Sequence, residues 1–145
     1  MPTDPAYLQK FSCFRHLSED QLRVVAQLAN AVCFLPGYVL SEEGKLAKYL
    51  YLLTSGKVEV LYSIGEGGPT RVDIISGEEV VGCSALAPPF TYSATARCLT
   101  EIEALELEIE ALRKLMQEDC PLGFSIQQHI MNILLDRIVN FRLGA

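Results

Sequence analysis

Few side chains in this sequence are of the types that carry catalytic or metal chemistry. The chain of 145 residues holds only two histidines, His16 and His129, and its five cysteines are widely spaced, without a Cys-x-x-Cys pair. A zinc site needs three or four such ligands grouped together, so the pattern predicts no metal. No nucleophile has a base and an orienting acid at motif spacing, and no glycine-rich phosphate loop precedes a helix. The sequence therefore predicts a protein that is not an enzyme.

Charge and hydropathy argue against two classes of partner. The formal net charge is −6 at pH 7, whereas binding to a nucleic-acid backbone needs clustered lysine and arginine that displace counterions. No apolar run approaches the roughly 18 residues that span a bilayer, and the first residues lack the basic and apolar regions of a signal peptide. We expect a cytoplasmic protein with no nucleic-acid partner, no membrane segment and free thiols that are mostly buried.

The elements that must position any site change in pattern along the chain. The stretch Ser18-Glu19-Asp20-Gln21 has the form of a capping box and predicts an amphipathic helix over residues 18–31. From 32 to 108, short apolar or alternating runs are broken by glycine-containing turns, which is typical of a β-sandwich or barrel. Helical spacing resumes near Leu112, and a last helix is predicted from about Leu122 to Phe141. Helices therefore bracket a region of sheet.

Two features of the predicted sheet can be read locally. The runs Tyr49–Leu53 and Val58–Tyr62 flank a Ser-Gly-Lys turn, and a β-hairpin is the simplest interpretation. Further on, Leu105 and Leu107 alternate with glutamates, which predicts a strand with one solvated face.

The last helix carries apolar side chains over more of its circumference than packing on one barrel would use. They are Phe124, Ile126, Ile130, Met131, Ile133, Leu134, Leu135, Ile138 and Val139. One interpretation packs all of them within the chain. We favour a homodimer through this helix, in which the isoleucines at 126, 130, 133 and 138 of two copies face each other.

Specific motifs connect these elements to a known family. In order they are Cys13-Phe14-x-x-Leu17-Ser18, Leu35-Pro36-Gly37, Glu42-Glu43-Gly44, Leu50-Tyr51-Leu52-x-x-Ser55-Gly56-Lys57-Val58-Glu59-Val60, Gly77-Glu78, Gly82, Ala85-Leu86 and Ser93-Ala94-Thr95-Ala96. Nearly the whole chain resembles the cyclic nucleotide-binding domain of the catabolite activator protein superfamily. The resemblance implies a mainly β fold, a double-stranded β-helix (jelly-roll) barrel with N-terminal helices and a C-terminal helix. It implies one domain over 1–145, with helices at 1–31, barrel at 32–108 and helices at 109–145.

In that superfamily a phosphate-binding cassette holds the ligand, and here it maps to residues 81–94. Backbone N–H groups and an arginine grip the cyclic phosphate, and a glutamate accepts the ribose hydroxyl. Cys83 stands where the glutamate is expected and Tyr92 where the arginine is expected. Each lost contact is worth about 1.5–3 kcal/mol, so binding should weaken by about two to four powers of ten. The resemblance thus implies no ordinary affinity for cyclic AMP or cyclic GMP.

Arginines elsewhere do not replace the missing one. Arg97 lies five residues after Tyr92 on what we predict to be the same strand, and an odd offset points it to the other face. Arg71 lies on an earlier strand, where a solvated surface position is expected. The donors and hydroxyls that remain predict a set of ligand-binding residues suited to a less charged effector: Gly82, Cys83, Ser84, Ala85, Tyr92, Ser93 and Ala94.

Two functional hypotheses follow from the resemblance. In the first, a small, nucleotide-like effector of unknown identity binds the cassette and shifts the C-terminal helix, and with it a dimer partner or another protein. No other cofactor is expected. In the second, Cys83 and Tyr92 fill the old pocket and the domain acts only as a dimerisation or protein-interaction module. A cassette open to solvent favours the first hypothesis, while Tyr92 or Phe90 filling it favours the second.

Overall fold

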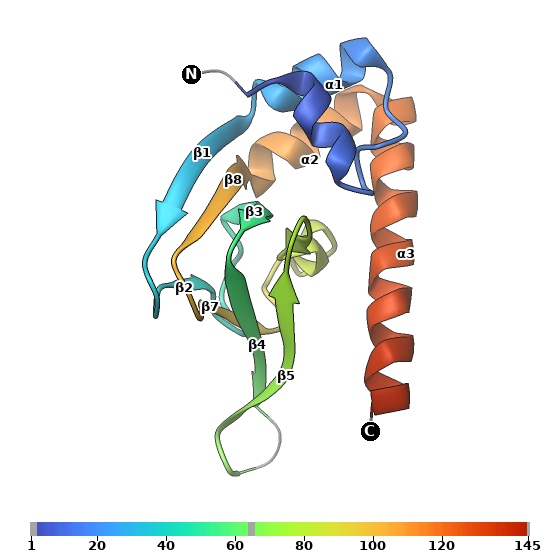
Figure 1. Ribbon diagram of the computed structural model, residues 1–145. Helices are drawn as coiled ribbons and strands as arrows, with labels where there is room; N and C mark the ends of the chain where they lie inside the picture. The colour runs from blue at the N-terminus through green and yellow to red at the C-terminus, as the bar shows by residue number, and fades with distance from the viewer. Residues whose placement is uncertain (1–2, 64–65, 145) are drawn as a thin grey trace. The chain divides into compact units, whose positions relative to one another are not determined.

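The computed structural model describes residues 3–63 and 66–144, with side chains of the last helix described to residue 139. The chain forms two compact units, one from residues 1–29 and 110–145 and the other from residues 30–109 (Figure 1). The first unit is helical, and the second contains the sheets. Whether the whole of 1–145 behaves as one domain stays a prediction.

The helical unit begins with a 3-10 helix, Pro5–Lys10, followed by α1, Glu19–Ala26. The Ser18 hydroxyl accepts from the Gln21 N–H at 3.2 Å, and the Gln21 side chain accepts from the Ser18 N–H at 2.9 Å. The predicted capping box is thereby confirmed. The helix ends earlier than predicted, because the residues from Ala29 onward extend into a strand instead.

The C-terminal helices are α2, Ile109–Glu118, and α3, Cys120–Gly144 (Figure 1). The Asp119 carboxylate accepts the Leu122 N–H at 3.2 Å, which satisfies one of the free donors at the start of α3. Gly123 lies so close to the Met116 carbonyl that a Cβ there would collide with it. This glycine therefore permits the tight corner between the two helices.

The sheet region is a jelly roll of two four-stranded antiparallel sheets, as predicted. One sheet has the order β1-β8-β3-β6 and the other β2-β7-β4-β5. The strands are β1 Ala29–Phe34, β2 Val39–Ser41, β3 Tyr49–Ser55, β4 Lys57–Ser63, β5 Pro69–Ser76, β6 Val80–Val81, β7 Thr95–Cys98 and β8 Ile102–Glu108.

The predicted hairpin between Tyr49–Leu53 and Val58–Tyr62 is wrong. These runs form β3 and β4, but β3 pairs with β6 and β8 whereas β4 pairs with β5 and β7. The turn at Gly56 carries the chain from one sheet to the other. Gly56 has φ +97°, and a Cβ there would lie 2.5 Å from the Glu101 carbonyl oxygen. Only glycine fits both that conformation and that approach.

Replacing Gly56 by alanine should therefore be more costly than the same change at a comparable turn. Gly77 also has a positive φ, +78°, but a methyl group there would meet no atom within 4 Å. Gly77→Ala should lower the free energy of unfolding by about 1–2 kcal/mol, because it introduces only backbone strain. Gly56→Ala should lose at least about 2 kcal/mol more, because backbone atoms must move. Urea unfolding of both variants measures the difference, and equal losses would contradict the close packing at Gly56.

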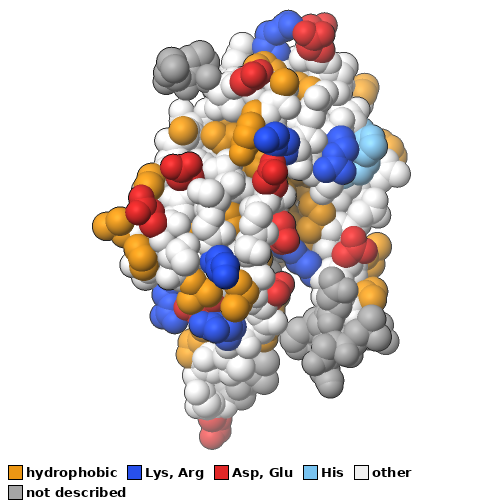
Figure 2. Space-filling view, viewed as in Figure 1, with side chains coloured by type: hydrophobic (Ala, Val, Ile, Leu, Met, Phe, Trp, Pro, Cys, Tyr) orange, Lys and Arg blue, Asp and Glu red, His pale blue; other side chains and the backbone are white. Residues whose placement is uncertain are grey.

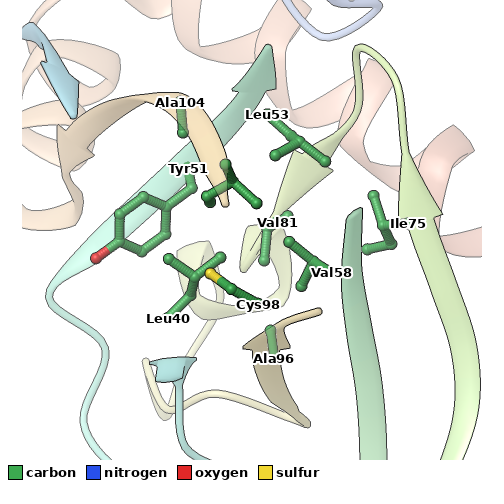
Figure 3. Close-up of a cluster of buried hydrophobic side chains, with 10 residues drawn as sticks. Leu40, Tyr51, Leu53, Val58, Ile75, Val81, Ala96, Cys98 and Ala104 are labelled. Carbon is green, nitrogen blue, oxygen red and sulfur yellow. The ribbon is translucent and has the colours of Figure 1, made fainter. Parts of the chain in front are cut away.

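The core between the sheets takes side chains from strands of both, as Figure 3 shows. Its buried members are Leu40, Tyr51, Leu53, Val58, Ile75, Val81, Ala96, Cys98, Ile102 and Ala104. Burial raises the pKa of the Cys98 thiol, so it packs as a small apolar group. None of the five cysteines forms a disulfide in the described structure; Cys13, Cys83 and Cys98 are buried, whereas Cys33 and Cys120 are exposed.

The expectation of one solvated face on β8 holds only in part. Glu108 at the end of the strand is exposed, but Glu106 on the same face is half-buried. Its neighbours on the same face, Ile102 and Ala104, belong to the core. A glutamate thus enters the inner face of the roll, where water reaches it incompletely.

Candidate functional site

The cassette begins where β6 ends. Gly82 has φ +90° and caps a short 3-10 helix, Cys83–Leu86, after which an irregular loop leads to β7. A Cβ on Gly82 would lie 3.1 Å from Cε1 of Tyr92, so the tyrosine ring packs directly against this glycine. Gly82 is therefore needed both for its left-handed backbone and for the close approach of Tyr92.

Several backbone donors of the cassette are already used within it. The N–H of Ala85 donates to the Gly82 carbonyl at 3.1 Å, and the N–H of Ala87 donates to the Ser84 carbonyl at 3.3 Å. The side chains of Cys83 and Ala85 are buried, at 2% and 0% exposure. The Ala85 N–H, which the sequence placed among the ligand donors, is thus held by its own turn.

Tyr92 is the best-fixed side chain of the cassette. Its hydroxyl donates to the Tyr49 carbonyl at 2.6 Å and accepts the Tyr49 N–H at 3.1 Å. Tyr92 is 7% exposed, and burial raises the pKa of its phenol. One residue of β3 therefore occupies both the donor and the acceptor of this hydroxyl.

The backbone on either side of Tyr92 is fixed as well. Gly44 N–H donates to the Tyr92 carbonyl at 2.9 Å, and Tyr92 N–H donates to the Lys45 carbonyl at 3.0 Å. Ala47 N–H donates to the Phe90 carbonyl at 2.9 Å, which extends the same pairing. Backbone hydrogen bonds thus join the cassette loop to residues 44–47, and this pairing directs the Tyr92 side chain inward.

The two serines predicted to face a ligand lie together. The hydroxyl oxygens of Ser84 and Ser93 are 2.9 Å apart; Ser93 is exposed and Ser84 half-buried. Ala94, next in the predicted set, has its carbonyl hydrogen-bonded to the Ser41 hydroxyl at 3.1 Å. The serine pair is thus a polar feature of the cassette that solvent can reach.

Near the cassette, the inner face of the roll holds an acid that the sequence assigned to solvent. Glu106 lies opposite Tyr51 in the β3–β8 pairing. Burial raises the pKa of the Glu106 carboxyl, and a hydrogen bond with the Tyr51 side chain opposes that rise. Tyr51 is 4% exposed, and its own pKa is raised chiefly by burial.

Glu106→Gln should therefore stabilise the protein at neutral pH. Because the folded pKa is raised, the carboxyl costs stability progressively as pH rises from about 4.3, its usual unfolded value, through the folded pKa. Glutamine removes that cost and keeps an oxygen for Tyr51, so the melting temperature at pH 7 should rise by on the order of 1 °C. The gain should vanish near pH 4. Glu108→Gln, an exposed change on the same strand, is the control, and an equal gain there would contradict the role of burial.

A second carboxylate, Glu59 on β4, forms an ion-pair cluster that sequence analysis missed. Arg71 Nε lies 3.1 Å from one of its oxygens, and Arg97 Nε and Nη2 each lie 2.9 Å from the other. These hydrogen bonds, that from Arg97 foremost, lower the pKa of Glu59 although its burial opposes them. The only local signal was a charge within the apolar run Val58-Glu59-Val60, since its partners lie far along the chain.

The cluster also shows where the two arginines lie. The prediction that Tyr92 and Arg97 share a strand is wrong, because Tyr92 precedes β7. Arg97 nonetheless points away from the core, because its neighbours Ala96 and Cys98 fill the opposite face. Arg71 is half-exposed, as a surface position requires, but it is ion-paired.

The two histidines meet in the helical unit. The rings of His16 and His129 stack with centroids 4.2 Å apart, and His129 Nδ1 lies 2.7 Å from the Ser125 carbonyl oxygen. Across residues 3–63 and 66–144 the structure shows no group of three or more His, Cys, Asp or Glu side chains that could hold a metal ion. No helix in the described part of the chain is long and apolar enough to cross a membrane.

The jelly-roll fold agrees with a comparison against protein families. The model of the cyclic nucleotide-binding domain family matches residues 31–119. The chain belongs to this family. A CRP-like cAMP-activated global transcriptional regulator of Mycobacterium tuberculosis is 22% identical over 90% of this chain and 57% of its own length. The cGMP-dependent protein kinase egl-4 of Caenorhabditis elegans is 26% identical over 76% of this chain but only 14% of its own. The chain thus spans little more than half of the first of these relatives.

Solved structures share the fold over nearly the whole chain. A Geobacter metallireducens protein described as a candidate cyclic nucleotide-binding protein has a TM-score of 0.84 and 25% identity, covering 94% of this chain and 98% of its own. A cyclic nucleotide-binding domain from Methylobacillus flagellatus has a TM-score of 0.83 at 17% identity, covering 97% and 83%. The family match and these structures together show a domain with the cyclic nucleotide-binding domain fold.

Proposed function

We propose that this domain is a non-catalytic regulatory module whose cassette is closed by Tyr92, so that it does not bind cyclic AMP or cyclic GMP with ordinary affinity. The supporting observation is the double hydrogen bond between the Tyr92 hydroxyl and the Tyr49 backbone, at 2.6 and 3.1 Å. A phenol so engaged has no further proton to give a phosphate, and it carries no positive charge. The geometry thus favours regulation by contact with another chain.

Electrostatics add to this. In the family, an arginine and a glutamate supply two charge-assisted contacts, whereas Tyr92 and Cys83 are uncharged and buried here. Losing two such contacts weakens binding by about two to four powers of ten. A ligand that binds related domains at micromolar concentrations would need millimolar concentrations in this one.

A second function, binding of a less charged effector at the cassette, is favoured by the serine pair. Ser84 and Ser93 present two hydroxyls 2.9 Å apart at a surface that solvent reaches. Such a pair can donate to and accept from a neutral polar group. An effector held there would contact the loop that Tyr92 anchors.

We also propose that the domain signals through α3 and that it does so as a homodimer. Among the described side chains of this helix, to residue 139, five apolar ones are 49–68% exposed: Phe124, Met131, Leu135, Ile138 and Val139. Positions 124, 131, 135 and 138 follow helical spacing along one face. The predicted isoleucine contact between two copies needs correction. Ile126 and Ile130 are 0% and 5% exposed within one chain, so they cannot also contact the partner copy.

A thermal-shift screen tests the proposal. A ligand present at 100 times its Kd stabilises a folded protein by about 2.7 kcal/mol, which for a chain of this size raises Tm by several degrees. We expect no shift with about 100 µM cyclic AMP or cyclic GMP. Cyclic dinucleotides, mononucleotides and haem complete the panel and test the second function. A rise of several degrees with cyclic AMP, supported by a low-micromolar calorimetric Kd, would refute closure by Tyr92.

A further inference from the structure

The outer face of the sheet β2-β7-β4-β5 carries an ordered row of side chains that the cassette does not use. Val39 pairs with Arg97, Arg97 pairs with Glu59, and Glu59 pairs with Ile74. Directly paired residues of antiparallel strands project to the same side of a sheet. Since the alternate residues on these strands fill the core, this row lies on the outside. Figure 2 shows basic and hydrophobic side chains interspersed over the lower part of the roll.

The central acid of the row fixes the two cations beside it. The Glu59 side chain is 6% exposed, whereas those of Arg71 and Arg97 are 50% and 46% exposed. Within the described part of the chain, Arg71 contacts Glu59 through Nε, and Arg97 does so through Nε and Nη2. Two guanidinium groups are thus held in place by one carboxylate with donors left over, and the cluster keeps a net charge of about +1.

Apolar surface flanks the cluster at both ends of the row. Val39 and Ile74 are each 45% exposed. A small inorganic anion would leave these side chains in water, whereas an extended peptide would cover them as it crosses the strands. The row therefore combines a fixed positive centre with an apolar contact on each side.

We propose that this outer row, Val39, Arg97, Glu59 and Ile74 with Arg71 beside it, docks an acidic segment of a partner protein with apolar residues next to its carboxylate. A single carboxylate matches the net charge that remains after Glu59 is counted, whereas a phosphate dianion exceeds it. The chain's overall charge of −6 opposes long polyanions, so nucleic acid does not fit. The docking site shares no residue with the cassette or with α3.

Fluorescence anisotropy with the full chain tests this docking. The probe is a short fluorescein-labelled peptide of alternating glutamate and leucine, and its glutamine-for-glutamate analogue measures the charge dependence. We expect saturable binding of the acidic peptide with Kd at or below about 100 µM and at least tenfold weaker binding of the analogue. Arg71→Gln and Arg97→Gln should each weaken the acidic peptide about tenfold. Arg23→Gln, which removes the same charge from an exposed pair on α1, should change nothing.

Two further measurements separate docking from a structural role of the arginines. Ile74→Thr keeps a β-branched residue and all charges, and it should weaken the peptide about threefold without changing competition by inorganic phosphate. Ile74→Thr also tests the docking if an arginine variant does not fold. The proposal is overturned if the acidic peptide does not bind, if Arg97→Gln and Ile74→Thr both bind it as the unchanged protein does, or if phosphate or single-stranded DNA competes at lower concentration than the peptide.

Discussion

The double variant Cys83→Glu, Tyr92→Arg should bind cyclic AMP two to four powers of ten more tightly than the unchanged protein, which calorimetry would detect as a new micromolar Kd. The two substitutions restore the charged contacts that the family's cassette uses, each worth about 1.5–3 kcal/mol. Removing the tyrosine also frees the space against Gly82, where its ring now packs. The gain is the largest effect expected of any change to this chain.

Tyr92→Phe is the matched control for the double variant. It removes the hydroxyl that bonds the Tyr49 backbone and adds no charge. Both variants should lose about 1–3 kcal/mol of stability, because the Tyr49 backbone groups lose their partner, but only the double variant should gain binding. Circular dichroism and urea unfolding establish that each is folded. A folded double variant that does not bind cyclic AMP would show that more than these two residues closes the cassette.

Leu135→Glu should convert a homodimer into monomers, halving the mass measured by light scattering from twice 16.0 kDa to 16.0 kDa. Leu135 is 58% exposed near the middle of the apolar face of α3. Across a two-fold contact the variant places two glutamates in a desolvated site. The cost is several kcal/mol, which is comparable to the free energy of a micromolar association. Within a single chain the same glutamate stays in water, so the melting temperature of the monomer should hardly change.

Two controls make this result specific. Gln117→Glu adds the same charge at an exposed site of α2 and should leave the dimer intact. Ile130→Glu places a charge where the side chain is 5% exposed, so it should lower the melting temperature rather than simply separate the copies. If the unchanged protein already has the monomer mass at about 50 µM, the homodimer is refuted and the face of α3 is left for a different protein.

Signals carried by neighbouring residues led to correct predictions. The Ser18–Gln21 capping box closes within one helical turn, so its four residues were enough to identify it. The jelly-roll fold followed from motifs matched to a family, and the order of turns and apolar runs was sufficient for that match. The end of α1 could not be placed, because Ala29–Phe34 is drawn into a sheet by strands far away in sequence.

Pairings between distant residues were the part that spacing could not predict. Tyr92 and Tyr49 are 43 residues apart, and Arg97 and Glu59 are 38 apart. The hairpin prediction failed for the same reason, since two apolar runs on either side of a glycine do not reveal that their partners lie in different sheets. The mapping of the cassette to residues 81–94 stays a prediction, and the hydrogen bonds that hold Tyr92 join it to backbone groups of Tyr49 that no motif identifies.

The Tyr49 backbone has a consequence for how such a cassette could change during evolution. Tyrosine both donates and accepts at this position, whereas arginine only donates and phenylalanine does neither. No single replacement of Tyr92 by either residue satisfies both the N–H and the carbonyl of Tyr49, and a domain with a few kcal/mol of margin loses a sizeable part of it. A lineage that replaced tyrosine by arginine in this cassette, or the reverse, would therefore pass through a less stable protein. A second change that first gave the Tyr49 N–H another acceptor would avoid this loss.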